Sequence, residues 1–274
     1  MPELPEVETV RRSLEKRLLG RKIKKVNIFM PKLIKIPGPE DFERGLEGAR
    51  IDALKRRGKY LLICLSTGFI WVTHLRMTGQ LIYSRPNDEV QKHTHLIFEL
   101  DNGDQLRYVD IRRFGTIYLL KPEEFSLVKG LRELGPEPLG DDFSFEKFSN
   151  ELKNKKGKLK QLLLDQRFIA GIGNIYADEI LFDAGLQPER LANTLNDDEL
   201  QKLYRSIRSV LQLGIANRGT SMRNYVDGDG RTGDFQKLLK VYGKGGQPCP
   251  KCGRILLKQR VGGRSSCYCK HCQK

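Results

Sequence analysis

Residues 249–272, CPKCGRILLKQRVGGRSSCYCKHC, decide the fold of the C-terminal part of this chain. The stretch begins and ends with a Cys-x2-Cys pair, and sixteen residues separate the two pairs. This spacing is typical of four-cysteine zinc sites. Each pair bends the chain so that two thiolates reach one tetrahedral ion, and four thiolates complete its coordination shell. We therefore expect one structural zinc ion, held by Cys249, Cys252, Cys269 and Cys272.

The remaining cysteines do not suggest a disulfide framework. Five of the six cysteines lie in the last 26 residues, and Cys64 stands alone in an apolar run where a buried strand residue is expected. A disulfide-stabilised secreted protein would be small, with its cysteines spread more evenly. Cys267 and His271 are alternative zinc ligands with less suitable spacing.

Positive charge is concentrated around the same stretch. Residues 235–274 include ten Lys or Arg and no Asp or Glu, and the whole chain has a net charge of +15. Because basic side chains that meet phosphates release counterions, this segment is predicted to grip a DNA backbone. An anionic membrane surface is the other partner that such a charge suits. No run of about 18 apolar residues could span a bilayer, and no apolar signal region opens the chain, so we expect a cytosolic protein.

A helical region precedes the basic tail. Apolar residues at helical spacing predict helices over 145–153, within 161–184 and over 197–213. The basic run 153–160 leads into the second of these. Within AGIGNIYADE (170–179), two glycines precede a helix start capped by Asn174, whose backbone N–H groups suit a phosphate. Tyr176 stands where a dinucleotide-binding fingerprint would have its third glycine, so that motif is excluded.

The first half of the chain has a different pattern. Residues 5–19 predict an amphipathic helix, and from about 22 to 120 short β-rich runs alternate with turn signals. These runs are KVNIFM (25–30), YLLICL (60–65), FIWVTHL (69–75), QLIYS (80–84), THLIFEL (94–100), QLRYV (105–109) and TIYLL (116–120). Repeated hairpins favour an antiparallel sandwich or a barrel-like sheet. Proline, glycine and acidic residues then cluster at 134–144. We expect an α+β protein with three domains: a β-sandwich catalytic domain with an N-terminal helix (1–134), a helical DNA-binding domain with a flexible loop at 218–234 (135–234), and a zinc-finger hairpin (235–274).

Two turns in the β-rich half carry an unusual mixture of residues. HLRMTG (74–79) and DIRRFGT (110–116) place Met, Arg and Phe beside glycines. Met and Phe commonly lie in protein cores. The alternative is that Met77, Arg112 and Phe114 form an apolar and cationic wedge that fills the gap left by an extruded base. The pattern leaves both interpretations open.

The first nine residues, MPELPEVET, concentrate acids in a basic chain. Pro5 and the glutamates that follow it suit the first turn of a helix. The segment Met1–Pro2–Glu3 lies ahead of that turn, and helix chemistry does not account for it.

Taken together and in this order, several motifs resemble the bacterial formamidopyrimidine-DNA glycosylase family: MPELPEVET, RRGKYL, HLRMTG, KHTH, DIRRFGT, LLLDQ…AGIGNIYADE and the terminal cysteine pairs. The family removes 8-oxoguanine from DNA and cuts abasic sites. The resemblance implies that Met1 is removed, so that Pro2 becomes a nucleophilic secondary amine. It also implies that Glu3 is the general acid/base and that Lys59 is its basic partner at the deoxyribose.

The resemblance further implies which residues meet DNA. Residues 161–184 would form a helix–two-turn–helix, and residues 218–234 would fold over the extruded base. Arg264 would contact DNA and assist the last elimination step. Met77, Arg112 and Phe114 match the void-filling positions of the family. The other implied DNA contacts are His74, His93, Lys156, Asn174, Tyr176 and Arg223.

The implied reaction is excision of an oxidised purine, followed by β,δ-elimination through a Schiff base on Pro2. Its partner would be duplex DNA with an oxidised purine or an abasic site, bound by a monomer in the bacterial cytoplasm, on the nucleoid. One alternative is an endonuclease VIII-like glycosylase for oxidised pyrimidines, whose members typically open with PEGPE rather than PELPE. A second is a non-catalytic, zinc-dependent DNA-binding protein. Arg218, Ser265 and Cys267 depart from the pattern of the family, which bears on lesion preference.

Overall fold

The computed structural model describes residues 1–274, which form two units. The first unit consists of Met1–Arg132 and Asn217–Asp234, and the second of Glu133–Ala216 and Phe235–Lys274. Segment 217–234 thus belongs with the sheets, whereas the sequence-based division placed all of it in the helical domain 135–234. The physical reason is its hydrogen bonding, since Gly228 N–H donates to Ser13 Oγ at 2.8 Å and Gly228 O accepts from Tyr83 N–H at 2.8 Å.

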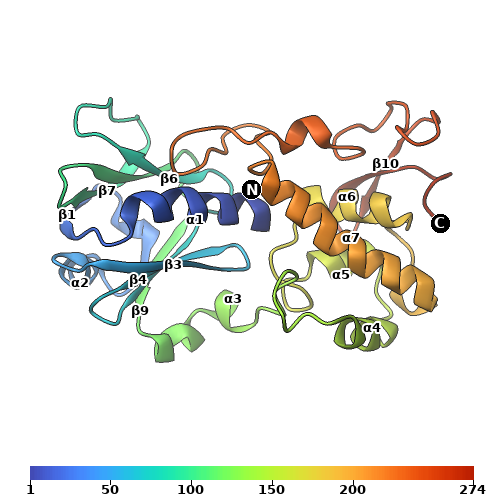
Figure 1. Ribbon diagram of the computed structural model, residues 1–274, viewed down its shortest axis with the longest axis horizontal. Helices are drawn as coiled ribbons and strands as arrows, with labels where there is room; N and C mark the ends of the chain where they lie inside the picture. The colour runs from blue at the N-terminus through green and yellow to red at the C-terminus, as the bar shows by residue number, and fades with distance from the viewer. The chain divides into compact units, whose positions relative to one another are not determined.

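Two sheets make up most of the first unit (Figure 1). The four-stranded sheet has the order β1 (Ile23–Ile28), β7 (Thr94–Leu100), β8 (Gln105–Asp110) and β6 (Gly79–Ser84). The five-stranded sheet has the order β2 (Ile34–Ile36), β9 (Thr116–Leu120), β5 (Ile70–His74), β4 (Tyr60–Leu65) and β3 (Ile51–Arg57). The expected antiparallel pairing holds everywhere except between β2 and β9, which are parallel.

Helix α1 (Leu4–Leu18) lies between the two sheets in Figure 1. Its apolar stripe is at most 1% exposed and consists of Val7, Val10, Leu14 and Leu18. This stripe shares one core with Trp71 of one sheet and Phe98 of the other, whose ring centroids are 4.2 Å apart. The helix is therefore packed against both sheets. Two shorter helices, α2 (Pro39–Leu46) and α3 (Lys129–Arg132), complete the unit.

The second unit contains four helices and one hairpin. They are α4 (Phe145–Lys153), α5 (Leu159–Leu164), α6 (Asn174–Ala184), α7 (Asp197–Ala216), and strands β10 (Leu257–Val261) and β11 (Arg264–Tyr268). A capping box begins α7, where Asn196 and Glu199 exchange hydrogen bonds of 2.9 and 3.0 Å. The predicted cap of α6 is wrong by one residue. Gly173 takes the extended capping conformation, and Asn174 is already helical.

None of the helices combines the length and the apolar composition needed to cross a bilayer.

Candidate active site and DNA interface

Pro2 and Glu3, which precede α1, and Glu6 in its first turn are buried, whereas Met1 is exposed. Glu3 is 3% exposed and Glu6 is 2% exposed, although both are carboxylic acids. Glu6 Oε2 accepts a hydrogen bond of 2.8 Å from the backbone N–H of Glu3, across the first turn of the helix. A buried carboxylate needs such donors, because desolvation otherwise disfavours its charge. The start of α1 is thus a rigid support for the residues that precede it.

Two cations and two acids act electrostatically on the N-terminal amine. Burial lowers the pKa of the Met1 ammonium below 8.0, Lys59 and Arg112 lower it further, and Glu3 and Glu6 oppose them. Lys59 is only 6% exposed and follows Gly58, which turns the chain from β3 into β4 with φ +55°. The sequence-predicted group of Pro2, Glu3 and Lys59 is therefore brought together within electrostatic range of the terminal amine.

Glu6 also connects the amine region to segment 217–234. Its Oε1 accepts a hydrogen bond of 2.7 Å from Thr220 N–H, and its carbonyl accepts one of 3.2 Å from the Tyr225 hydroxyl. Gly219, at φ +74°, allows this close approach, since a Cβ there would lie 2.7 Å from the same carboxylate oxygen. Sequence reasoning gave Glu6 no partner, because Thr220 is more than 200 residues away along the chain.

Arg218 begins this segment in a conformation that L residues rarely adopt, at φ +59°. Its guanidinium forms an ion pair with Asp227, which also accepts hydrogen bonds from the backbone N–H groups of Asp229 and Arg231 at 3.0 and 2.9 Å. The arginine at position 218, which departs from the pattern of the family, is thus held by its ion pair with Asp227 within the same segment. Arg223, the predicted base reader, lies in the same segment and is exposed.

The candidate wedge residues are exposed rather than buried. Met77 is 43% exposed and Phe114 is 53% exposed, so the core interpretation of these two residues is wrong. The Arg112 guanidinium lies 4.6 Å from the centroid of the Phe114 ring, within cation–π range. Arg76 and Arg113 have φ values of +53° and +58°, which places one strained residue in each of the two turns. Exposed apolar side chains on strained turns are typical of binding sites.

The two predicted histidine contacts differ in character. His93 is partly exposed and its carbonyl accepts from Asp110 N–H at 3.0 Å. His74 is 6% exposed, and its Nδ1 accepts from Arg76 N–H at 3.0 Å, which leaves the ring proton on Nε2. Burial lowers the pKa of His74 to about 3, with further contributions from Arg76 and Lys59. His74 is therefore a neutral donor at physiological pH and contributes no positive charge.

In the second unit, the start of α6 is bonded to the hairpin. Asn174 Nδ2 donates to Ser265 O at 3.1 Å, and Lys160 Nζ donates to the same carbonyl at 2.7 Å. Lys160 also forms a buried ion pair of 2.7 Å with Asp178, and both side chains are at most 1% exposed. This internal support for the hairpin was missed by sequence reasoning, because a lysine in a basic run is expected at the surface. The predicted contacts Lys156 and Arg264 are exposed.

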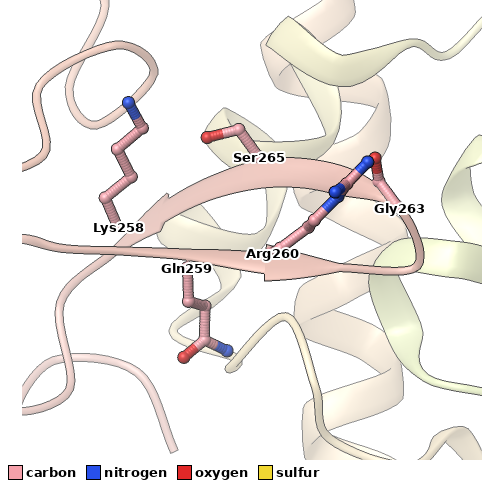
Figure 2. Close-up of a pocket in the computed structure, with 5 residues that line it drawn as sticks. All are labelled: Lys258, Gln259, Arg260, Gly263 and Ser265. Atoms are coloured by element: carbon pink, nitrogen blue, oxygen red, sulfur yellow. The ribbon is translucent and has the colours of Figure 1, made fainter.

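Tyr176 is fully buried, and its ring stacks on Phe235 with centroids 5.2 Å apart. The whole residue has 0% exposed surface, so the predicted DNA contact at Tyr176 finds no accessible group in this structure. The exposed face of the hairpin carries a hollow of about 520 Å³ (Figure 2). Lys258 and Arg260 border it from one strand and Ser265 from the other, while Gln259 points to the opposite side. The charge of this face suits a phosphate backbone.

The four predicted zinc ligands meet in one cluster. The Sγ atoms of Cys249, Cys252, Cys269 and Cys272 all lie within 4.8 Å of one another. Two of the separations are 3.9 Å (Cys249–Cys272) and 3.6 Å (Cys252–Cys269). Four sulfurs at about 2.3 Å from one ion in a tetrahedron are about 3.8 Å apart, so the cluster fits one structural zinc ion.

The alternative ligands lie outside this cluster. Cys267 is 4% exposed and packs with Phe182 and Leu256, and its backbone N–H donates to Asp178 at 3.1 Å. His271 Nδ1 is hydrogen-bonded to Arg254 at 2.8 Å. Four cysteines therefore complete the site without either residue.

Family models match the chain in three places. The formamidopyrimidine-DNA glycosylase N-terminal domain matches residues 1–117, and the H2TH domain of the same glycosylase matches residues 134–226. The zinc finger found in FPG and IleRS matches residues 246–274.

Relatives of known name and structure cover the whole chain. The formamidopyrimidine-DNA glycosylase of Pelotomaculum thermopropionicum is 51% identical over 274 residues, which is 100% of this chain and 99% of the relative. That of Heliobacterium modesticaldum is 53% identical, with full coverage of both. The solved complex between Lactococcus lactis Fpg and DNA containing an abasic site has a TM-score of 0.92 and 38% identity, and the match covers 99% of each chain. The chain therefore belongs to the formamidopyrimidine-DNA glycosylase family.

Proposed function

We propose that this glycosylase excises oxidised purines from duplex DNA and then cuts the abasic strand, with the amine of Pro2 as its nucleophile. The observation that carries the proposal is the surrounding of the terminal amine by buried Glu3, Glu6 and Lys59. Base-excision repair is the function of the family, and its solved members include Lactococcus lactis Fpg bound to DNA with an abasic site or with Fapy-dG.

The first step needs a neutral amine. Removal of Met1 leaves Pro2 as the terminus, one residue from the position where burial and nearby cations already lower the pKa of an ammonium. A terminal amine is ordinarily half protonated near pH ~8, so any lowering increases its neutral fraction at pH 7. The Pro2 nitrogen attacks C1′, the bond from C1′ to the base breaks, and the base leaves with the bonding electrons and takes up a proton. Glu3 delivers this proton as general acid.

The later steps use the electron sink that a secondary amine creates. The Pro2 nitrogen gives up its proton and the C1′–O4′ bond breaks, while O4′ takes up a proton and stays on C4′ as a hydroxyl. The iminium cation that this leaves on Pro2 acidifies the C2′ proton. Removal of that proton by a carboxylate such as Glu3 expels the 3′ phosphate, and a second elimination expels the 5′ phosphate. Lys59 stabilises the negative charge at the deoxyribose phosphates. Arg264 is proposed to assist the final elimination.

The exposed turns that carry Met77, Arg112 and Phe114 take part in base extrusion. Met77, Arg112 and Phe114 fill the space that the extruded nucleotide leaves, which offsets lost stacking. Arg223 and the backbone of 218–234 cover the extruded base. Phosphates are held by His74, His93, Lys156 and Asn174.

The partner is duplex DNA with an oxidised purine or an abasic site. We expect a monomer that acts in the bacterial cytoplasm, on nucleoid DNA. The rival substrate class, oxidised pyrimidines, predicts faster excision of thymine glycol than of 8-oxoguanine. The PELPE opening and the Arg112–Phe114 pair favour the purine.

Borohydride trapping tests the proposal. The Met1-processed protein is mixed with 8-oxoguanine duplex and borohydride, and a covalent protein–DNA adduct is expected from reduction of the iminium. A variant with one glycine inserted ahead of Pro2 is the control, because it keeps every side chain but moves the amine. No adduct from correctly processed, zinc-loaded protein, or equal trapping by the control, contradicts Pro2 as the nucleophile.

A further inference from the structure

One buried carboxylate joins the two turns that carry the wedge residues. Asp110, at the end of β8, has no exposed surface. Its Oδ1 accepts from the Thr78 hydroxyl at 2.5 Å and from Arg112 N–H at 3.2 Å. Its Oδ2 accepts from Gly115 N–H at 2.9 Å and from the Tyr108 hydroxyl at 3.4 Å. Four donors converge on this carboxylate, and three of them come from the two turns.

Thr78 completes the connection from the other side. Its oxygen donates to Asp110 and accepts from Arg112 N–H at 3.0 Å. The hydroxyl of the Met77 turn is therefore a direct bridge to the backbone of the Arg112–Phe114 turn. Thirty-four residues separate Thr78 from Arg112 along the chain, so no local signal connects them.

The surrounding geometry leaves these turns little freedom. A Cβ at Gly115 would lie 1.6 Å from the Tyr108 hydroxyl oxygen, and one at Gly79 would lie 2.5 Å from Leu75 O. Each turn also contains an arginine at positive φ, Arg76 and Arg113. Such conformations persist only where the surrounding structure holds them in place. Arg76 is held by its N–H, which donates to His74 Nδ1, and Arg113 lies between Arg112 and Gly115, whose N–H groups both donate to Asp110.

We infer that Asp110 and Thr78 are positioning residues, which hold the Met77 turn and the Arg112–Phe114 turn at one fixed separation so that both enter the base stack together. This inference rests on the proposed function, since it assigns a use to the wedge. Neither residue touches the reacting atoms. A duplex with a paired lesion requires the wedge most, because its base must be unpaired and unstacked, whereas an abasic site has no base to extrude.

The test removes one hydroxyl from each of two buried or half-buried positions. Thr78→Val deletes the bridge and keeps the shape of the side chain. Thr73→Val is the matched control, because Thr73 is 1% exposed and its hydroxyl has no hydrogen-bond partner. Thr78→Ser keeps the hydroxyl and is expected to restore wild-type behaviour.

Two readouts separate positioning from folding. In single-turnover reactions, Thr78→Val is expected to excise 8-oxoguanine opposite cytosine ~10-fold more slowly, while its cleavage of an abasic duplex changes by less than about twofold. With 2-aminopurine opposite the lesion, the fluorescence rise that reports wedge insertion is expected to fall at saturating protein. Thermal unfolding of both valine variants shows whether the fold is intact.

Three outcomes overturn the inference: equal behaviour of Thr78→Val and Thr73→Val, equal losses on both substrates, or failure of Thr78→Ser to restore excision. Failure of the proposed function looks different, because the wild-type protein would then trap no adduct on either substrate. The 2-aminopurine signal does not depend on chemistry, so it still tests the wedge in that case.

Discussion

Glu6→Gln replaces one carboxylate oxygen with an NH2 group and tests how the nucleophile is held. The wild-type carboxylate accepts from Glu3 N–H at 2.8 Å through one oxygen and from Thr220 N–H at 2.7 Å through the other. A glutamine keeps one acceptor and turns the other into an NH2 group that faces a backbone donor. The substitution therefore breaks one of the two connections while it conserves the size of the side chain.

The magnitude follows from the number and type of bonds. A hydrogen bond to a charged group contributes about 1.5–3 kcal/mol, and the remaining bond becomes a weaker neutral one, so the total loss is about 3 kcal/mol. If all of this loss raises the activation free energy of the reaction, the rate falls by ~100-fold, since 1.36 kcal/mol corresponds to a factor of ten. Glu6 is 2% exposed, so solvent does little to replace the lost interaction.

The assay is single-turnover borohydride trapping on an abasic duplex, which reports the nucleophile without base extrusion. Glu15→Gln is the control on the same helix, because Glu15 is 39% exposed and its ion pair with Arg11 is at the surface. Surface pairs contribute about 0–1 kcal/mol, so this control is expected to trap within about fivefold of wild type. If Glu6→Gln and Glu15→Gln trap at equal rates, Glu6 does not position the N-terminal amine.

Three further predictions concern stability and zinc. Lys160→Met leaves Asp178 buried without its cation and is expected to lower the free energy of unfolding by about 3–5 kcal/mol. The control Lys158→Met removes an exposed ion pair and is expected to lower it by less than about 1 kcal/mol. Equal losses of the two variants in urea unfolding contradict the prediction. The pKa of His74 is about 3 in the folded protein and near 6.5 in the unfolded chain. Between these pH values the unfolded state binds more protons, so the folded state loses stability as the pH falls from 6.5 toward 3. His74→Asn is therefore expected to flatten the dependence of the urea midpoint on pH, and an unchanged slope argues against a neutral imidazole. Chelation of zinc is expected to weaken DNA binding before the sheets unfold. Unfolding of the sheets is measured by the fluorescence of Trp71, which is the only tryptophan and lies in β5. Simultaneous loss of DNA binding and of the folded fluorescence signal contradicts an independent zinc hairpin.

Local patterns in the sequence were sufficient for much of the fold. Helix α1, strands β4, β7 and β9, and the four zinc ligands coincide with the predicted segments and residues. Strand β3 was missed, because IDALKRR combines apolar and basic residues and has no clean alternation. The short β2 and helix α2 were missed as well, since they lack the length that makes a periodic pattern visible.

The sequence by itself determined the zinc site, the helix that follows Pro2, and the kinds of residue available for chemistry, because these depend on spacing within a few residues or on motif order. Only the tertiary structure decided which groups share one environment. Glu6 meets Thr220, Asp110 meets Thr78, and burial makes His74 a neutral donor, although none of these follows from a local pattern. The physical reason is that hydrogen bonds and desolvation act through space, whereas sequence periodicity reports only neighbours along the chain.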